Sequence, residues 1–273
     1  MVLAYLRRVG GVVSQSLLRL VRRPSHSRRA QARRSMARRW LFLFVIAAVV
    51  IVASMLALDV PAIRLMPERG TASLWPVRIF TEFAKTEYVL AVLAAALIVL
   101  ILALPLLPQS SHAGASLLGI QLQYIFLSVL IARIVGEILK FTVGRGRPFV
   151  GGDANAYNFS PFARSEAFYS FPSGHALTAF AMAFAVSSLW PRLNIAMWIF
   201  AVLICVSRVV LLAHHPSDVV AGALVGVIGA MFVRYWFAAR RLGFTIQADG
   251  TVVPFHGSLR DALKGVARRA SAT

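Results

Sequence analysis

Hydrophobic residues in this chain are gathered into six long runs that are separated by more polar stretches of varied length. Each run is close to the roughly 20 residues that an α-helix needs to cross a bilayer, although the fourth is short. A backbone inside a bilayer must satisfy its own hydrogen bonds, so we expect these runs to be helices. The pattern predicts an all-α fold, a bundle of six transmembrane helices. The runs lie near 40–58, 88–107, 115–140, 175–190, 193–213 and 217–238.

The polar segments at the two ends divide the chain into three expected parts. The run that starts at Trp40 is longer than the apolar region of a signal peptide, about 7–15 residues, so we interpret it as an uncleaved first span. In the C-terminal tail, Asp249 and Gly250 predict a β-hairpin, and a helix is expected to start near Ser258. The expected parts are a basic segment 1–39, a membrane domain 40–240 and a basic tail 241–273.

Composition argues against a soluble enzyme. Hydrophobic residues make up 59% of the chain and charged residues only 14%, whereas soluble domains carry about a quarter charged residues. The 29 Lys and Arg against 10 Asp and Glu would suit either nucleic acid or anionic lipid. The apolar runs favour anionic lipids bound at the basic tails, and no nucleic-acid-binding module is present.

The distribution of arginine predicts an orientation. Arginine is dense before the first run and after the last one, so both termini are expected to be cytoplasmic, which six spans permit. The compact basic chain suggests a bacterial inner-membrane protein. The end of the third span, the start of the fourth, and the turn between the fifth and sixth would then all face the periplasm.

Three clusters of polar residues fall on that one face, where ionisable groups are costly and mark candidate functional sites. Lys140, Arg147 and Arg208 bring positive charge with little acid nearby, which favours a bound anion. Arginine matches the forked geometry of a phosphate. Ser173 and Gly174 precede a helix, whose N-terminus adds backbone donors for an anion. Together these residues predict a phosphate-binding site.

Histidines in the same clusters could turn such a site into an enzyme. Asp218 would lie in the first turn of the sixth helix, after Pro216, and could accept a hydrogen bond from His214. The other ring nitrogen of His214 would then be free to attack phosphorus. His175, from another helix, could protonate the leaving oxygen. Because the cations are side chains, neither a metal nor a cofactor is expected.

At these positions the chain resembles the type 2 phosphatidic acid phosphatase family. Its motifs K-x6-R-P, P-S-G-H and S-R-x5-H-x3-D begin at Lys140, Pro172 and Ser207. The resemblance covers roughly residues 85–240. It implies a phosphohistidine mechanism with a nucleophile, an acid and an orienting carboxylate, which are His214, His175 and Asp218 by position. The implied phosphate-binding set is Lys140, Arg147, Ser173, Gly174 and Arg208. His215 lies outside the pattern and is interpreted as a neighbour or a helix cap.

The expected function is hydrolysis of a lipid phosphate or diphosphate. The candidate substrates are undecaprenyl diphosphate, the phosphates of lipid A, phosphatidylglycerol phosphate and phosphatidic acid, of which an outward-facing site favours the first two. Two alternatives stay open: a phosphotransferase with a lipid or sugar acceptor, and a non-catalytic binder or transporter. Loops 59–87 and 149–171 are expected to set headgroup selectivity. The sequence does not indicate the oligomeric state.

Overall fold

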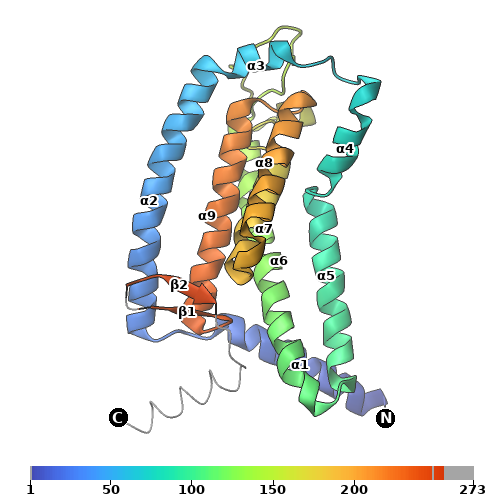
Figure 1. The fold of residues 1–273 in the computed structure, drawn as a ribbon, viewed down its shortest axis with the longest axis vertical. Coiled ribbons are helices and arrows are strands. Elements are labelled where there is room, and N and C mark those ends of the chain that lie inside the picture. The colour runs from blue at the N-terminus through green and yellow to red at the C-terminus, as the bar shows by residue number, and fades with distance from the viewer. Residues whose placement is uncertain (1, 248, 255–273) are drawn as a thin grey trace.

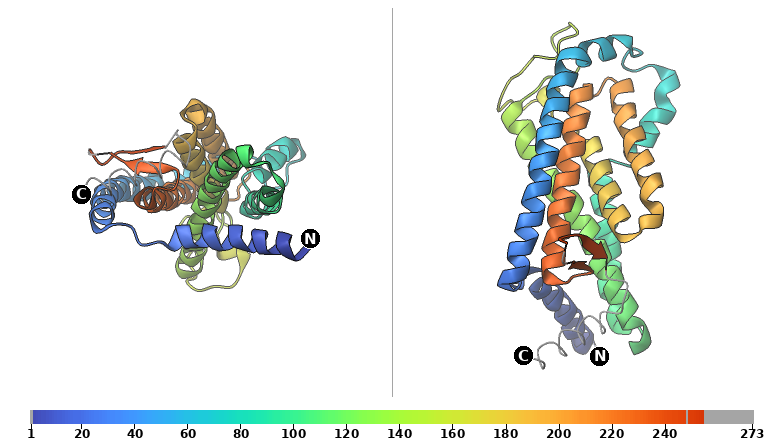
Figure 2. Two further views of the ribbon diagram at one scale, coloured as in Figure 1. Left: turned by 90° about the horizontal axis from the view of Figure 1, so that it is seen from below. Right: turned by 60° about the vertical axis from the view of Figure 1, so that its left-hand side comes forward.

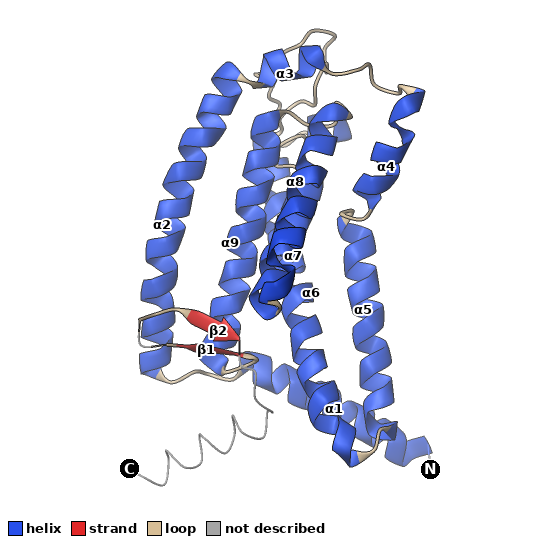
Figure 3. Ribbon diagram, viewed as in Figure 1, coloured by secondary structure: helices blue, strands red, loops and turns tan. Residues whose placement is uncertain are grey.

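The structure, a computed structural model, describes residues 2–247 and 249–254, and these form a helical bundle with one small β-hairpin (Figures 1 and 3). The all-α fold class is confirmed, and the helix expected from Ser258 lies outside the described residues. The helices are α1 (Val2–Val21), α2 (His26–Ala57), α3 (Asp59–Leu65), α4 (Trp75–Glu82), α5 (Thr86–Ala103), α6 (His112–Val143), α7 (Gly174–Leu189), α8 (Asn194–Val210) and α9 (Pro216–Arg240). The hairpin consists of β1 (Phe244–Ile246) and β2 (Val252–Pro254).

The chain is a multi-pass membrane protein. Five helical segments of the described chain are long and apolar enough to cross a bilayer; they contain α2, α5, α6, α8 and α9. The remaining helix, α7, corresponds to the short fourth run; it has 16 residues and is therefore about 24 Å long. It packs against α6, α8 and α9. These six helices correspond to the six predicted runs, except that α2 starts at His26 instead of residue 40, because the arginine-rich segment before it consists largely of good helix formers.

Two glycines on α9 allow it to lie directly against α7. A Cβ at Gly222 would lie 2.4 Å from the backbone oxygen of Ser173, and one at Gly226 would lie 2.3 Å from that of Leu177. Small residues four apart let two membrane helices approach this closely. The first turns of α7 and α9 are therefore brought together, and both carry predicted site residues.

The segment between α2 and α5 covers the end of the bundle where those first turns lie. In Figure 1, α3 crosses above α9, and α4 stands upright above α5. Helix α4 packs against α8, although Trp75, Ile79 and Phe83 remain exposed.

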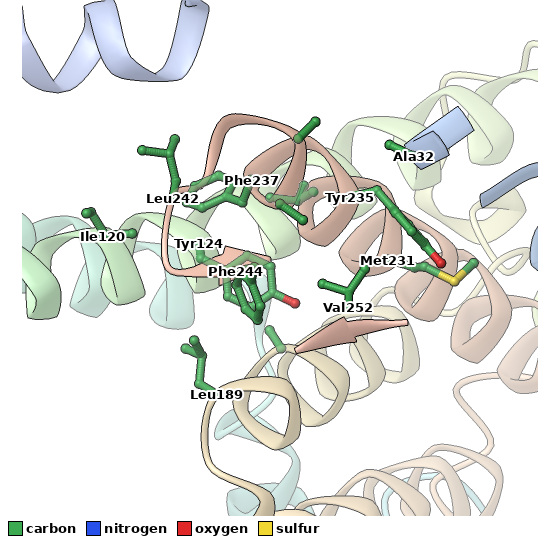
Figure 4. Packing of buried hydrophobic residues seen from close by; sticks show 14 of the residues in the cluster. Ala32, Ile120, Tyr124, Leu189, Met231, Tyr235, Phe237, Leu242, Phe244 and Val252 are labelled. Atoms are coloured by element: carbon green, nitrogen blue, oxygen red, sulfur yellow. The ribbon is translucent and has the colours of Figure 1, made fainter. Parts of the chain in front are cut away.

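An aromatic cluster closes the opposite end of the bundle. Phe244 of β1 packs against Tyr124 of α6 with 4.8 Å between ring centroids, and Phe237 of α9 lies 5.5 Å from the same tyrosine (Figure 4). The predicted hairpin is confirmed, with Asp249 and Gly250 in its turn. Beneath it, α1 lies across the bundle instead of along it (Figure 2).

Candidate active site

The three motifs meet at the α3 end of the bundle because their loops are fixed to one another. Gly144 ends α6 in the left-handed conformation (φ 56°). The residues after it run beside a later part of the same α6–α7 loop, where Gly146 N–H donates to Asn158 O over 2.8 Å. Ser173 N–H, just before α7, donates to Asp218 O over 2.9 Å. The loops after α6 and before α7 and α9 therefore form one connected layer.

Arg145 is the centre of that layer and is fully buried. Its guanidinium donates to Asp59 Oδ2 over 2.7 Å, to Asp218 Oδ1 over 2.6 Å and to Ser217 Oγ over 2.6 Å. Two further bonds reach Ala156 O over 2.8 and 3.0 Å. One cation thus joins α3, the α6–α7 loop and the start of α9. A buried arginine paired with two carboxylates in this way serves to position the site, since its donors are all directed at protein groups.

Asp218 lies in the first turn of α9, as predicted, but its direct partner is not His214. The distance from Asp218 Oδ2 to His214 Nδ1 is 4.0 Å, which is too long for a hydrogen bond. The same oxygen accepts from Ser170 Oγ over 2.6 Å and from His215 N–H over 2.8 Å. His215 is the N-cap of α9, so its interpretation as a helix cap is confirmed. The expected bond is absent because these two donors already occupy that oxygen.

His214 is held instead by a backbone carbonyl. Its Nδ1 lies 2.8 Å from Ser170 O. A carbonyl oxygen only accepts hydrogen bonds, so Nδ1 carries the proton and Nε2 keeps its lone pair. Burial lowers the pKa of His214 well below its ordinary value, and the positive charge of Arg208 lowers it further. The imidazole is therefore neutral at pH 7, the state that a nitrogen nucleophile requires.

Three buried polar atoms around His214 have no hydrogen-bond partner within the described chain. They are Ser173 Oγ, His175 Nε2 and Arg208 Nε. Arg208 NH1 donates to Thr81 Oγ1 of α4 over 3.1 Å, which fixes the direction of the guanidinium. Buried donors are normally paired. A group of unpaired ones is what a site for an anion with several oxygens provides.

Lys140 approaches the same place from the end of α6. A Cβ at Gly174 would lie 3.3 Å from Lys140 Nζ, so the amine lies against the first turn of α7. Lys140 Nζ is 2.8 Å from Glu137 Oε1, and Arg133 NH1 is 2.9 Å from that same oxygen. Glu137 thus links Arg133 and Lys140 along one face of α6. The glutamate limits where the amine can move.

Beside these residues lies a cavity of about 410 Å³. Arg147 and Arg208, both predicted, line it together with Arg69 and Arg78, which were not predicted. Arg147 Nε donates to Glu166 O over 3.0 Å. Glu68 also lies at the wall. Four arginines against one glutamate make the cavity strongly positive.

The predicted site residues are thus brought together at one end of the bundle, and the comparisons with known proteins fall on the same part of the chain. Residues 121–242 match the PAP2 superfamily. This core belongs to that superfamily. The curated relatives include a lipid A 1-phosphatase of Rhizobium johnstonii, 36% identical over 46% of this chain and 52% of the relative. Another is an undecaprenyl-diphosphatase of Sulfolobus acidocaldarius, 36% identical over 37% of this chain and 47% of the relative.

This chain therefore spans about half the length of the curated relatives that it matches. Two solved structures are also similar to it. Aquifex aeolicus LpxE has a TM-score of 0.44 and 23% identity, and covers 65% of this chain with 94% of its own. A phosphatidylglycerolphosphate phosphatase of Bacillus subtilis has a TM-score of 0.47 and 21% identity, and covers 73% of this chain with 94% of its own.

Two buried residues of the PAP2 site escaped the sequence-based prediction. The sequence assigned no role to Arg145, and Asp59 falls at the start of the predicted loop 59–87. A signal existed for Asp59, since it is an acid directly after an apolar run and so lies at membrane depth. Its pairing with Arg145, 86 positions away, depends on the tertiary fold.

Proposed function

We propose that this protein is an integral membrane lipid phosphatase that works through a phosphohistidine on His214. The observation that carries the proposal is the neutral, buried imidazole whose Nδ1 donates to Ser170 O, next to unpaired donors of Ser173 and Arg208. A nucleophile with a free lone pair therefore lies beside groups suited to three phosphate oxygens. The curated relatives named as lipid phosphatases support the same reaction class.

In the first step, Nε2 of His214 attacks phosphorus. The N–P bond forms as the bond from phosphorus to the lipid oxygen breaks, and His175 protonates that oxygen. In the second step, water attacks the phosphohistidine while His175 takes its proton. The P–N bond breaks and inorganic phosphate leaves. Arg147, Arg208 and Lys140 stabilise the negative charge on the equatorial oxygens in both steps, with Ser173 and the backbone at Gly174 as further donors.

We propose undecaprenyl diphosphate or a phosphate of lipid A as the substrate, ahead of phosphatidylglycerol phosphate and phosphatidic acid. The four-arginine cavity beside the site supports placing phosphatidic acid last. A headgroup with a second anionic group could place that group against Arg69 and Arg78, whereas phosphatidic acid has one phosphate only. Relatives named for lipid A and for undecaprenyl diphosphate point the same way.

The deciding experiment is phosphate release by the purified protein from those four lipids, with EDTA present. Wild type is compared with His214→Ala and with His26→Ala, an exposed histidine at the start of α2. We expect release from one lipid, a loss of about 10³-fold or more in His214→Ala, and no change in His26→Ala. Persistent release in His214→Ala would exclude the nucleophile. If wild type releases no phosphate but forms a phosphorylated product when a hydroxyl acceptor is added, the protein is a phosphotransferase.

We further propose that the site faces the periplasm of a bacterial inner membrane and that both termini are cytoplasmic. The arginines of α1 and of the start of α2 lie at the bundle end opposite the site (Figure 1), as positive charge on the cytoplasmic side requires. A membrane-impermeant maleimide on intact spheroplasts tests this in a Cys205→Ala background. Asp153→Cys, in an exposed site loop, should be labelled, and Arg8→Cys should not. The reverse pattern would invert the topology.

A further inference from the structure

A second cavity lies at the bundle end opposite the proposed active site. It has a volume of about 590 Å³ and is enclosed by the α1–α2 connection, the first turns of α2 and the last turns of α9. Four arginines line it, namely Arg23, Arg29, Arg33 and Arg240. No residue of the phosphatase site reaches this end.

The positive charges around this cavity are not neutralised by the described part of the protein. Among the residues that the structure describes, no Asp or Glu lines the cavity. In residues 2–247 and 249–254, the side chains of Arg23, Arg29 and Arg33 make no hydrogen bond, and none of the four arginines takes part in an ion pair. The nearby hairpin brings Asp249, but its carboxylate accepts from Thr251 N–H and Oγ1 over 2.9 and 2.8 Å. Arg23, Arg29 and Arg33 are exposed, so water solvates them, but a cluster of guanidinium groups without acids creates a positive potential that attracts an anion.

Arg240 forms part of the cavity wall, and its orientation leaves the Nε donor without a hydrogen-bond partner in the described chain. Its side chain lies over the ring of Trp236, with 3.6 Å between Cζ and the ring centroid, and NH1 donates to Trp236 O over 3.2 Å. Its carbonyl accepts from Arg22 NH2 over 2.7 Å. The residue is only 7% exposed, and its Nε has no partner within the described chain. The hydroxyl of Tyr235, at 2% exposure, is likewise unpaired in the same cavity wall.

Above the arginines, the cavity wall becomes apolar. On α9, Phe232, Trp236 and Arg240 follow one another at four-residue spacing and so share one face. Met36 of α2 lines the cavity beside them, and Trp40 lies 6.1 Å from Phe232 between ring centroids. Both α2 and α9 are candidate membrane spans. The order from arginine to aromatic to aliphatic side chains follows the order of headgroup to acyl chain in a lipid.

We propose that this cavity binds an anionic phospholipid, with its phosphate among the four arginines and an acyl chain along Phe232 and Met36. Basic cavities between membrane helices recognise anionic headgroups in this way, and the guanidinium fork matches phosphate oxygens. A soluble phosphate would use the arginines but not the apolar wall. The bound lipid would be a structural ligand and not a substrate, because the site holds no nucleophile aimed at its phosphorus.

Two double variants of α2 separate a specific site from general attraction. Arg29→Ala/Arg33→Ala removes two arginines of the cavity, and Arg34→Ala/Arg38→Ala removes two exposed arginines of the same helix that do not line it. Native mass spectrometry of the detergent-solubilised protein gives the dissociation constant for phosphatidylglycerol. Phosphatidylcholine serves as the zwitterionic comparison, and inorganic phosphate as the competitor. Hydrolysis of a short-chain lipid phosphate reports on folding and on the proposed active site.

We expect Arg29→Ala/Arg33→Ala to weaken phosphatidylglycerol binding at least about tenfold, with wild-type binding in Arg34→Ala/Arg38→Ala and full hydrolysis in both. Arg29→Lys/Arg33→Lys, which keeps the charge but loses the fork, should fall between. Equal loss in both alanine variants would overturn the proposal, since charge alone would explain it. Displacement of the lipid by millimolar inorganic phosphate would overturn the lipid assignment in favour of a free anion. Because hydrolysis is read separately, a protein inactive on every lipid leaves this test intact.

Discussion

Replacing Arg145 by alanine should destabilise the end of the bundle that carries the proposed active site. Arg145 is fully buried and provides both ion pairs that reach Asp59 and Asp218. Those carboxylates are themselves buried, at 0% exposure, so they would lose their cationic partner without gaining water. Breaking a buried pair by removing one partner costs about 3–5 kcal/mol. Two carboxylates share this cation, which puts Arg145→Ala at the upper end of that range.

The assay is equilibrium unfolding in mixed detergent micelles, which gives the free energy of unfolding. Arg192→Ala is the control, because Arg192 is exposed in the turn before α8; its effect should stay within about 0.5 kcal/mol. Arg145→Lys should be intermediate, since one ammonium replaces a fork that reaches Asp59, Asp218 and Ser217. A loss below about 1 kcal/mol in Arg145→Ala would refute the reasoning, because it would mean that water or other donors replace the guanidinium.

Five further outcomes are expected. Since the pKa of His214 is depressed, the imidazole stays neutral as pH falls through its ordinary value of about 6.5, and kcat should stay level there; a decline centred on about 6.5 would contradict this. The unfolded chain binds that proton more readily, so the same group makes the free energy of unfolding rise with pH through this range, as pH-dependent unfolding would detect. Gly226→Val should cost about 1–3 kcal/mol in the same unfolding assay, because its side chain meets the backbone of α7. Arg78→Ala should raise KM for a lipid diphosphate more than for a monophosphate, with Arg64→Ala, at an exposed position of α3, as the unchanged control. Asp218→Asn should keep Nδ1 of His214 protonated, because the acceptor is Ser170 O, and ¹⁵N NMR of the imidazole reads the tautomer directly.

The sequence was sufficient to predict features that follow from a local pattern, and features marked by charged residues in apolar surroundings. Six apolar runs predicted the bundle, and the β-hairpin followed from the residues around Asp249. The positions of His214 and His175 at one end followed from counting spans. Contacts between groups that are far apart in the sequence were not predictable. The bond from His214 to Ser170 O, and the pairing of Arg145 with Asp59, arise only when α7 and α9 pack through Gly222.

The hydrogen-bond partners of each arginine distinguish structural arginines from those suited to bind a ligand. Position in the sequence does not make this distinction. Arg145 and Arg147 are two residues apart, yet the first has its donors directed at carboxylates, a hydroxyl and a carbonyl, while the second lines an open cavity. Arg208 also lines that cavity and leaves Nε unpaired within the described chain. Since a buried donor without a partner costs about 1–3 kcal/mol, its retention implies a compensating ligand. The same reasoning applied to Arg240, at the far end of α9, identifies the second anion site without reference to any motif.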